Sequence, residues 1–117
     1  MIVKQSQATM AKVDKPIGGE GYMDFLSIIG DGNRLKGSRF SMAAEITLPV
    51  GASVGYHDHP ADEEIYLILS GTGSYVENDH SEHPVGKGDL TLCPTGEGHA
   101  LINNGKEPLV FLAFIAE

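Results

Sequence analysis

The sequence predicts an all-β fold, either a sandwich or a barrel, and two observations support this class. Apolar and polar residues alternate over several short segments, as they do in strands with one buried face. The 15 glycines and six prolines separate these segments at short intervals, and no helical pattern longer than about ten residues lies between them. At 117 residues the chain is long enough for one domain with a buried core.

The first third of the chain is less regular than the rest. A weak helix candidate precedes residue 16, and residues 18–32, GGEGYMDFLSIIGDG, indicate an arm or an edge strand. We therefore expect residues 1–38 to form an N-terminal arm with edge strands. Residues 39–117 are expected to form the barrel, within one domain overall.

The barrel region contains several strand candidates in succession. Residues 39–48, RFSMAAEITL, place five apolar side chains on one face: Phe40, Met42, Ala44, Ile46 and Leu48. Residues 64–70, EIYLILS, are apolar on both faces, and residues 75–88, YVENDHSEHPVGKG, are typical of a strand end followed by a polar hairpin connection. The segments DLTLCP, HALINN and PLVFLAFIA predict three further strands.

Charge and composition exclude some classes of protein. The net charge of −8 repels phosphate backbones, and no cluster of lysine or arginine offsets it, so we expect no nucleic-acid partner. No run of 18 apolar residues is present, which predicts no membrane span. The N-terminus lacks the apolar region of a secretory signal, and the single cysteine, Cys93, allows no intrachain disulfide. These features predict a cytoplasmic protein.

Three histidines and a glutamate form the pattern with the clearest chemistry. His57 and His59 are two residues apart, so on a strand they point the same way, roughly 6–7 Å from each other along the strand. Glu64 opens the following strand, and His99 begins a later one after a glycine-rich turn. Three imidazoles and a carboxylate suit Mn²⁺, Fe²⁺ or Ni²⁺, with Zn²⁺ as a further possibility, and leave positions open for substrate or water.

The spacing around these residues matches two motifs of a known family. The pattern G-x5-H-x-H-x(3,4)-E-x6-G is filled by Gly51, His57, His59, Glu64 and Gly71. The pattern G-x5-P-x-G-x2-H-x3-N is filled by Gly88, Pro94, Gly96, His99 and Asn103. The chain therefore resembles the cupins, and in particular small stand-alone cupins of the oxalate-decarboxylase-like kind. The resemblance implies a double-stranded β-helix, or jelly-roll, barrel, the metal ligands His57, His59, Glu64 and His99, and a homodimer.

Some nearby residues have competing interpretations. Glu63 also satisfies the looser spacing of the first motif, but only Glu64 leaves six residues before Gly71, so Glu64 is preferred. His80 and His83 lie in the polar hairpin connection and are expected to be solvated rather than metal-bound. Cys93 lies in an apolar segment and is expected to behave as a small buried hydrophobe.

The same alternation predicts which side chains surround the metal. Tyr66 and Ile68 should face the interior with Glu64, and Leu101 should do so with His99. Tyr66 could donate a proton or orient a substrate, or could equally belong to the core. Phe40 and Met42 are expected at the mouth or floor of the barrel, where they line a substrate site or complete the core. Arg39 points to the opposite face, which speaks against an inward arginine that would hold oxalate.

These observations predict a metal-dependent cupin enzyme that acts on a small organic acid or another oxygen-rich molecule, by dioxygenation or decarboxylation. One alternative is a sugar or sugar-phosphate isomerase, which is less favoured because few basic residues could hold a phosphate. The other is a non-catalytic module that binds or senses a small ligand with the help of the metal. The apolar C-terminal segment, LVFLAFIA, either lies between two sheets or also contributes to a dimer interface.

Overall fold

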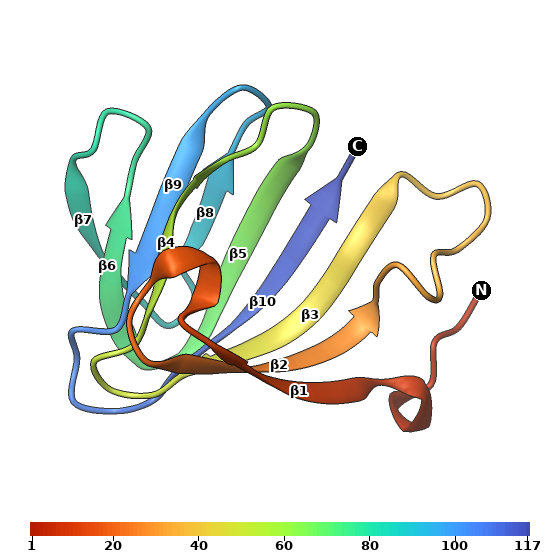
Figure 1. The fold of residues 1–117 in the computed structure, drawn as a ribbon, viewed down its shortest axis with the longest axis horizontal. Coiled ribbons are helices and arrows are strands. Elements are labelled where there is room, and N and C mark those ends of the chain that lie inside the picture. The colour runs from red at the N-terminus through yellow and green to blue at the C-terminus, as the bar shows by residue number, and fades with distance from the viewer.

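A computed structural model describes residues 1–117, and antiparallel strands account for most of the chain (Figure 1). The strands are β1 (Thr9–Asp14), β2 (Tyr22–Ile29), β3 (Phe40–Leu48), β4 (Ser53–Asp58), β5 (Glu63–Ser70), β6 (Thr72–Val76), β7 (Glu82–Gly86), β8 (Leu90–Cys93), β9 (Gly98–Ile102) and β10 (Leu109–Ala116). Two single 3₁₀ turns, η1 (Gln5–Gln7) and η2 (Pro16–Gly18), are the only helical elements. None of the helical segments is long and apolar enough to cross a bilayer.

The strands form two sheets that face each other (Figure 1). The larger sheet has six strands in the order β1-β2-β3-β10-β5-β8, and the smaller has four in the order β4-β9-β6-β7. Some neighbours come from distant parts of the chain, since β10 pairs with both β3 and β5 in the larger sheet and β9 pairs with both β4 and β6 in the smaller one. This arrangement is the predicted all-β, single-domain barrel, and the fold-class prediction is confirmed.

The core lies between the sheets and is made by alternate residues of the strands. On β3 the side chains of Ala44, Ile46 and Leu48 are buried, as the alternation predicts, whereas Phe40 at the start of the strand is 46% exposed. On β10 the inward face carries Leu109 and Phe111, both fully buried. Burial of such side chains stabilises each by roughly 1.5–3 kcal/mol, so the barrel does not depend on the histidine cluster for its core.

The N-terminal third differs from the sequence prediction in one respect. The weak helix candidate before residue 16 does not form a helix, because β1 occupies Thr9–Asp14 and only the single turn η1 is helical there. β1 pairs with β2 in full register, and β2 pairs with β3, so pairing with a neighbour outweighs the weak local preference. The predicted boundary between residues 38 and 39 falls in the loop between β2 and β3 and stays a prediction.

The turn η2 crosses to the smaller sheet and packs against β4, as the central coil of Figure 1 shows. The approach is close, because a Cβ atom added at Gly19 would collide with the carbonyl oxygen of Ser53, and one at Gly55 with that of Ile17. Ile17 has a φ of 48°, a left-handed conformation that is unfavourable for a β-branched residue. Packing between η2 and β4 therefore holds the backbone of Ile17 in this unfavourable conformation.

Candidate metal centre

The four residues of the predicted ligand set, three on strands and one directly after a strand, meet at one end of the barrel. His57 lies on β4 directly opposite His99 on β9, in the smaller sheet. His59 follows the end of β4, and Glu64 enters from β5 in the larger sheet. One donor atom from each of these four side chains lies within 4.8 Å of the others. The chain therefore has a cluster of three histidines and one glutamate of the metal-site type.

The donor atoms converge tightly. The Nε2 atom of His99 lies 3.1 Å from Nε2 of His57, 3.1 Å from Nε2 of His59 and 3.0 Å from Oε1 of Glu64. Oε1 of Glu64 is 3.2 Å from Nε2 of His59 and 3.6 Å from Nε2 of His57. Separations of about 3.0 Å are those of neighbouring ligands at right angles around a metal with bonds of about 2.1 Å.

The outer nitrogen of each imidazole has a partner that orients the ring. Nδ1 of His57 donates to the carbonyl oxygen of Gly55 at 2.8 Å, and Nδ1 of His59 donates to the carboxylate of Asp62 at 2.7 Å. Neither acceptor can donate, so both rings carry their hydrogen on Nδ1 and direct an Nε2 lone pair at the cluster. Nδ1 of His99 pairs with the hydroxyl of the buried Tyr75 at 2.8 Å. Such partners around metal-bound histidines fix their orientation.

These contacts allow a test of whether the cluster suits a cation. The lone pairs of His57 and His59 and the carboxylate of Glu64 all face Nε2 of His99, which carries at most one hydrogen. That hydrogen can satisfy only one of the three acceptors. In the other two close contacts, the lone pairs of two acceptor atoms would face each other without a hydrogen between them. A divalent cation accepts all of them, so the donor set fits a metal.

The pKa values of the cluster follow from burial and from these contacts. Burial acts to raise the pKa of Glu64, but the close imidazole nitrogens of His57, His59 and His99, which can donate to the carboxylate when they are protonated, outweigh it and hold that pKa far below its ordinary value. The same contact with Glu64 raises the pKa of His59, because a protonated His59 can donate to that carboxylate, whereas burial lowers the pKa of His99. Glu64 is thus a carboxylate at any physiological pH, and the fully buried His99 favours the neutral form that a metal requires.

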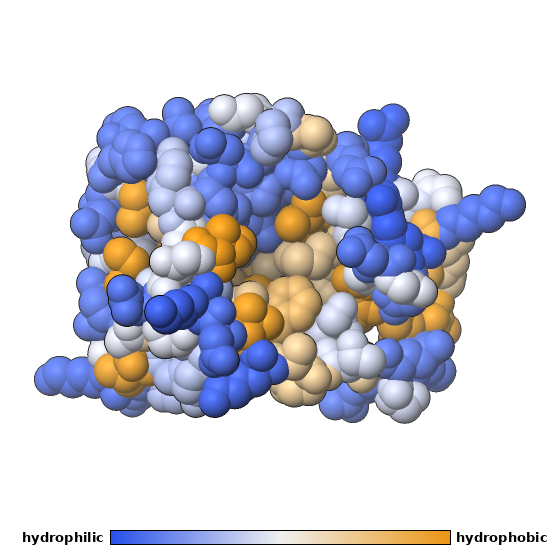
Figure 2. Space-filling view, in the orientation of Figure 1, coloured by the Kyte–Doolittle hydropathy of each residue, from blue (hydrophilic) through white to orange (hydrophobic).

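A cavity of about 130 Å³ opens beside the cluster, and Figure 2 shows apolar side chains gathered in the hollowed centre of this face. Three of the ligand residues, His57, His59 and Glu64, form one wall. The remaining walls are lined by Ile17, Met23, Phe25, Met42, Ile46, Val54, Tyr66 and Ile115. A ligand in this cavity would meet the donor cluster on one side and apolar surface on the others.

The residues predicted to surround a substrate occupy three kinds of position. Met42 and Tyr66 line the cavity, and the Tyr66 ring stacks on His99 with centroids 4.9 Å apart. Ile68 and Leu101 are buried in the core and do not line it. Phe40 is exposed and meets Phe114 edge to face, with ring centroids 6.4 Å apart. The substrate-binding roles themselves stay predictions.

Several cavity residues were missed by the sequence reasoning. Met23 and Phe25 share a face of β2, and the alternation within YMDFLSII could have indicated them. Ile46 lies on the face of β3 that the alternation had already identified. No sequence pattern indicates Ile17, because only the packing of η2 on β4 brings it to the cavity.

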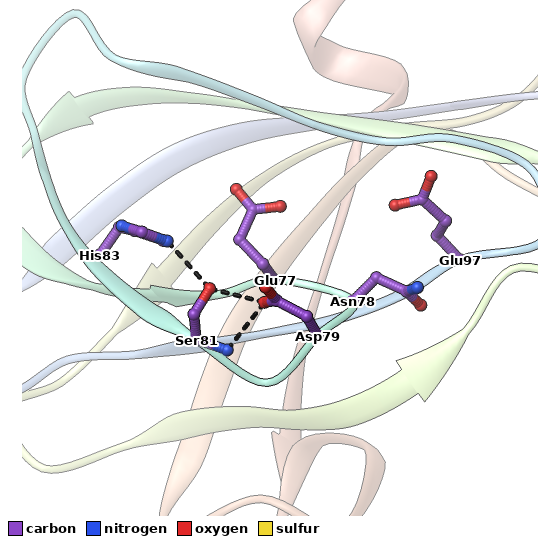
Figure 3. A pocket seen from close by; sticks show the side chains of 6 residues that line it. All are labelled: Glu77, Asn78, Asp79, Ser81, His83 and Glu97. Atoms are coloured by element: carbon purple, nitrogen blue, oxygen red, sulfur yellow. Dashed lines mark hydrogen bonds between the residues drawn. The ribbon is translucent and has the colours of Figure 1, made fainter.

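The remaining candidates lie away from the cluster. His83 belongs to a polar surface pocket of about 410 Å³ at the β6–β7 hairpin, where the Ser81 hydroxyl donates to Asp79 at 2.6 Å and lies 3.0 Å from Nε2 of His83 (Figure 3). His80 is exposed and stacks on Tyr56. Cys93 is 2% exposed, and burial raises its pKa to about 11, as expected of an unreactive thiol in an apolar environment.

The two arginines are also outside the cavity. Arg39 is exposed. Arg34 donates to both carboxylate oxygens of Glu117, at 3.3 and 3.0 Å, at the edge of a larger outer pocket that shares Phe25, Met42 and Ile115 with the cavity. Neither guanidinium lines the wall opposite the donor cluster.

A two-sheet barrel with three histidines and a glutamate at one end defines the cupin class of protein. The family model described as "Cupin domain" matches residues 44–115, and this chain belongs to the cupin family. The match includes both sequence motifs, from Gly51 to Asn103. The resemblance inferred from their spacing is confirmed.

Relatives extend the similarity to nearly the whole chain. An oxalate-binding protein of Thermotoga maritima is 32% identical over 115 residues, which cover 98% of this chain and 93% of the relative. The crystal structure of a predicted oxalate decarboxylase from Thermotoga maritima superposes with a TM-score of 0.86 at 32% identity, covering 99% of this chain and 98% of that one. A dimethylsulfoniopropionate lyase of Ruegeria pomeroyi superposes with a TM-score of 0.69 at 27% identity, but this chain covers only 47% of it.

Proposed function

We propose that this chain is a metal-dependent cupin that binds a small organic acid and turns it over by decarboxylation or dioxygenation. The observation that carries the proposal is the convergence of the four donor atoms, within 4.8 Å of one another, beside a small cavity that three of the four residues line. His57, His59, Glu64 and His99 would hold Mn²⁺, Fe²⁺ or Ni²⁺, or Zn²⁺. The metal would supply Lewis acidity, or a partner for O₂, to an oxygen-rich ligand.

The residues around the cluster have separate roles in this proposal. The apolar walls exclude bulk water from the ligand and strengthen its polar contacts. Tyr66 lines the cavity beside Glu64, and burial raises its pKa well above the ordinary value. Its hydroxyl therefore keeps its proton at physiological pH, so Tyr66 would donate a hydrogen bond to the bound acid and would not act as a base.

Replacing Tyr66 with phenylalanine tests this role. We expect the Tyr66→Phe variant to retain its metal, because the hydroxyl belongs to none of the four donors, and to bind the organic acid about tenfold more weakly, the effect of one lost hydrogen bond. Metal content and ligand affinity of the loaded protein measure the two effects. Unchanged affinity would assign Tyr66 to the core alone.

The proposed reaction can be tested against its alternatives with one preparation. Protein purified without chelator or a nickel column is analysed for metals, reloaded anaerobically with single ions, and supplied with small organic acids while O₂ uptake and CO₂ release are followed. O₂ consumption with iron supports dioxygenation, and CO₂ release without O₂ supports decarboxylation. Binding without either product supports the non-catalytic alternative, which the oxalate-binding relative favours. The isomerase alternative has less support, because no lysine or arginine lines the cavity to hold a phosphate.

We also propose a homodimer in the cytoplasm. The outer face of the larger sheet supports the dimer, because Leu90 and Leu92 on β8 are 58% and 46% exposed beside the half-buried Ile65 and Leu67 of β5. A second copy covering this face would remove its apolar surface from water. The single cysteine supports the compartment.

A further inference from the structure

The composition of the cavity wall narrows the class of ligand that the proposed site accepts. Eight of the 11 lining residues are apolar, and the other three are His57, His59 and Glu64 of the donor cluster. A ligand can thus make polar contacts on one side only, apart from the Tyr66 hydroxyl. Any polar group on its far end would lose water without gaining a partner, which weakens binding even for an uncharged group.

The charge of the site sets the charge of the ligand. Three neutral imidazoles and the Glu64 carboxylate leave a divalent cation with one uncompensated positive charge. No lysine or arginine lines the cavity. The guanidinium of Arg34 lines the adjoining outer pocket, but it is already paired with Glu117 at 3.0 Å. A monoanion therefore neutralises the site, whereas a dianion would leave a net negative charge in an apolar cavity.

The size of the cavity limits the body of the ligand. Its volume of about 130 Å³ is well below the roughly 300–1,000 Å³ of pockets for drug-sized molecules. At about 30 Å³ for each water-sized group, it holds roughly four such groups. Ile17, Met42 and Ile115 present branched or flexible apolar surface to them.

We infer that the cavity selects small monoanionic acids with one oxygen-rich head and a compact apolar body, such as short branched 2-oxo acids, and disfavours oxalate. The inference rests on the proposed metal-dependent function and specifies its ligand. The head lies at the donor cluster, and the apolar body fills the space between β2, β3 and η2. The apolar wall opposite the donor cluster discriminates between these monoanions and oxalate. The four donors and their metal would bind the head of either acid.

Titration calorimetry of the metal-loaded protein tests this inference with four compounds that share the head group. Glyoxylate, pyruvate and 3-methyl-2-oxobutanoate enlarge the apolar body stepwise, and oxalate carries a second negatively charged oxygen in place of that body. Each buried methylene increases affinity up to about fourfold. We expect 3-methyl-2-oxobutanoate to bind at least tenfold more tightly than either glyoxylate or oxalate.

A pair of variants locates the discrimination in the wall. Met42 lines both the cavity and the outer pocket, so the Met42→Lys side chain can place its charge at the mouth and should shift the affinity ratio at least tenfold towards oxalate. Thr47→Lys adds the same charge on the opposite face of β3 and should leave the ratio unchanged. Equal shifts in both variants would overturn the assignment to the wall.

The outcomes separate this inference from the proposed function. Protein that retains metal but binds oxalate as tightly as the branched acid, or shows no dependence on the apolar body, contradicts the ligand class and leaves the metal site standing. Protein that retains no metal at the cluster overturns the proposed function and, with it, the ligand class. Metal content is therefore measured on every sample before titration.

Discussion

Replacing His57 and His59 together with alanine is expected to abolish metal binding while the barrel stays folded. The two side chains supply two of the four converging donors, and neither belongs to the 13-residue hydrophobic core cluster. Metal at a hundred times its dissociation constant should stabilise the wild-type protein by about 2.7 kcal/mol, and the double variant should lose this gain. Metal content and thermal unfolding with and without added ion measure the effect.

Two matched controls test whether the loss is specific. Replacing His80 and His83 with alanine removes the same number of imidazoles from the exposed hairpin and should leave metal content unchanged.

Replacing Glu64 with glutamine should weaken metal binding by at least about a hundredfold. Loss of a group that only orients a metal ligand weakens binding by up to about that factor, and Glu64 is proposed as a ligand itself. Glu63→Gln alters the neighbouring, exposed carboxylate and should have no such effect. Full metal content in the His57/His59 double variant would rule out the proposed ligand set.

Alanine at Gly71 is expected to destabilise the barrel by more than about 3 kcal/mol, whereas alanine at Gly88 should cost only about 1–2 kcal/mol. Both glycines have left-handed backbones, with φ of 84° and 89°, so the conformational cost is nearly the same. They differ in their surroundings. A Cβ atom at Gly71 would collide with the Pro108 carbonyl oxygen and lie 3.0 Å from Cα of Leu109, whereas one at Gly88 meets nothing within 4 Å.

Urea unfolding of metal-free protein measures both free energies without a contribution from bound metal. Pro108 directly precedes β10, the strand between β3 and β5, so movement of its carbonyl would disturb the centre of the larger sheet. Equal losses in the two variants would mean that the chain around Pro108 adjusts at little cost. In that case the backbone conformation alone explains the need for glycine at both positions.

Much of the fold could be predicted from the sequence because the signals are local. The alternation over RFSMAAEITL predicts the buried face of β3, and the inward positions of Tyr66 and Leu101 follow from simple counting along β5 and β9. Asn103 is fully buried and donates to the carbonyl oxygens of Leu48 and Glu107, as expected of a side chain that caps backbone groups. The weak helix candidate before residue 16 is instead the strand β1, because pairing of β1 with β2 is not a local property.

The sequence by itself determined the all-β class and the four candidate ligands, since strand periodicity and motif spacing act over short distances along the chain. The tertiary structure alone decided that Ile17 and Met23 meet beside Glu64 in an apolar cavity, and that Arg34 is held by Glu117. It also separated Gly71 from Gly88, which the motifs treat alike. These features depend on contacts between strands and turns far apart in the chain, and such contacts exist only once the two sheets have packed.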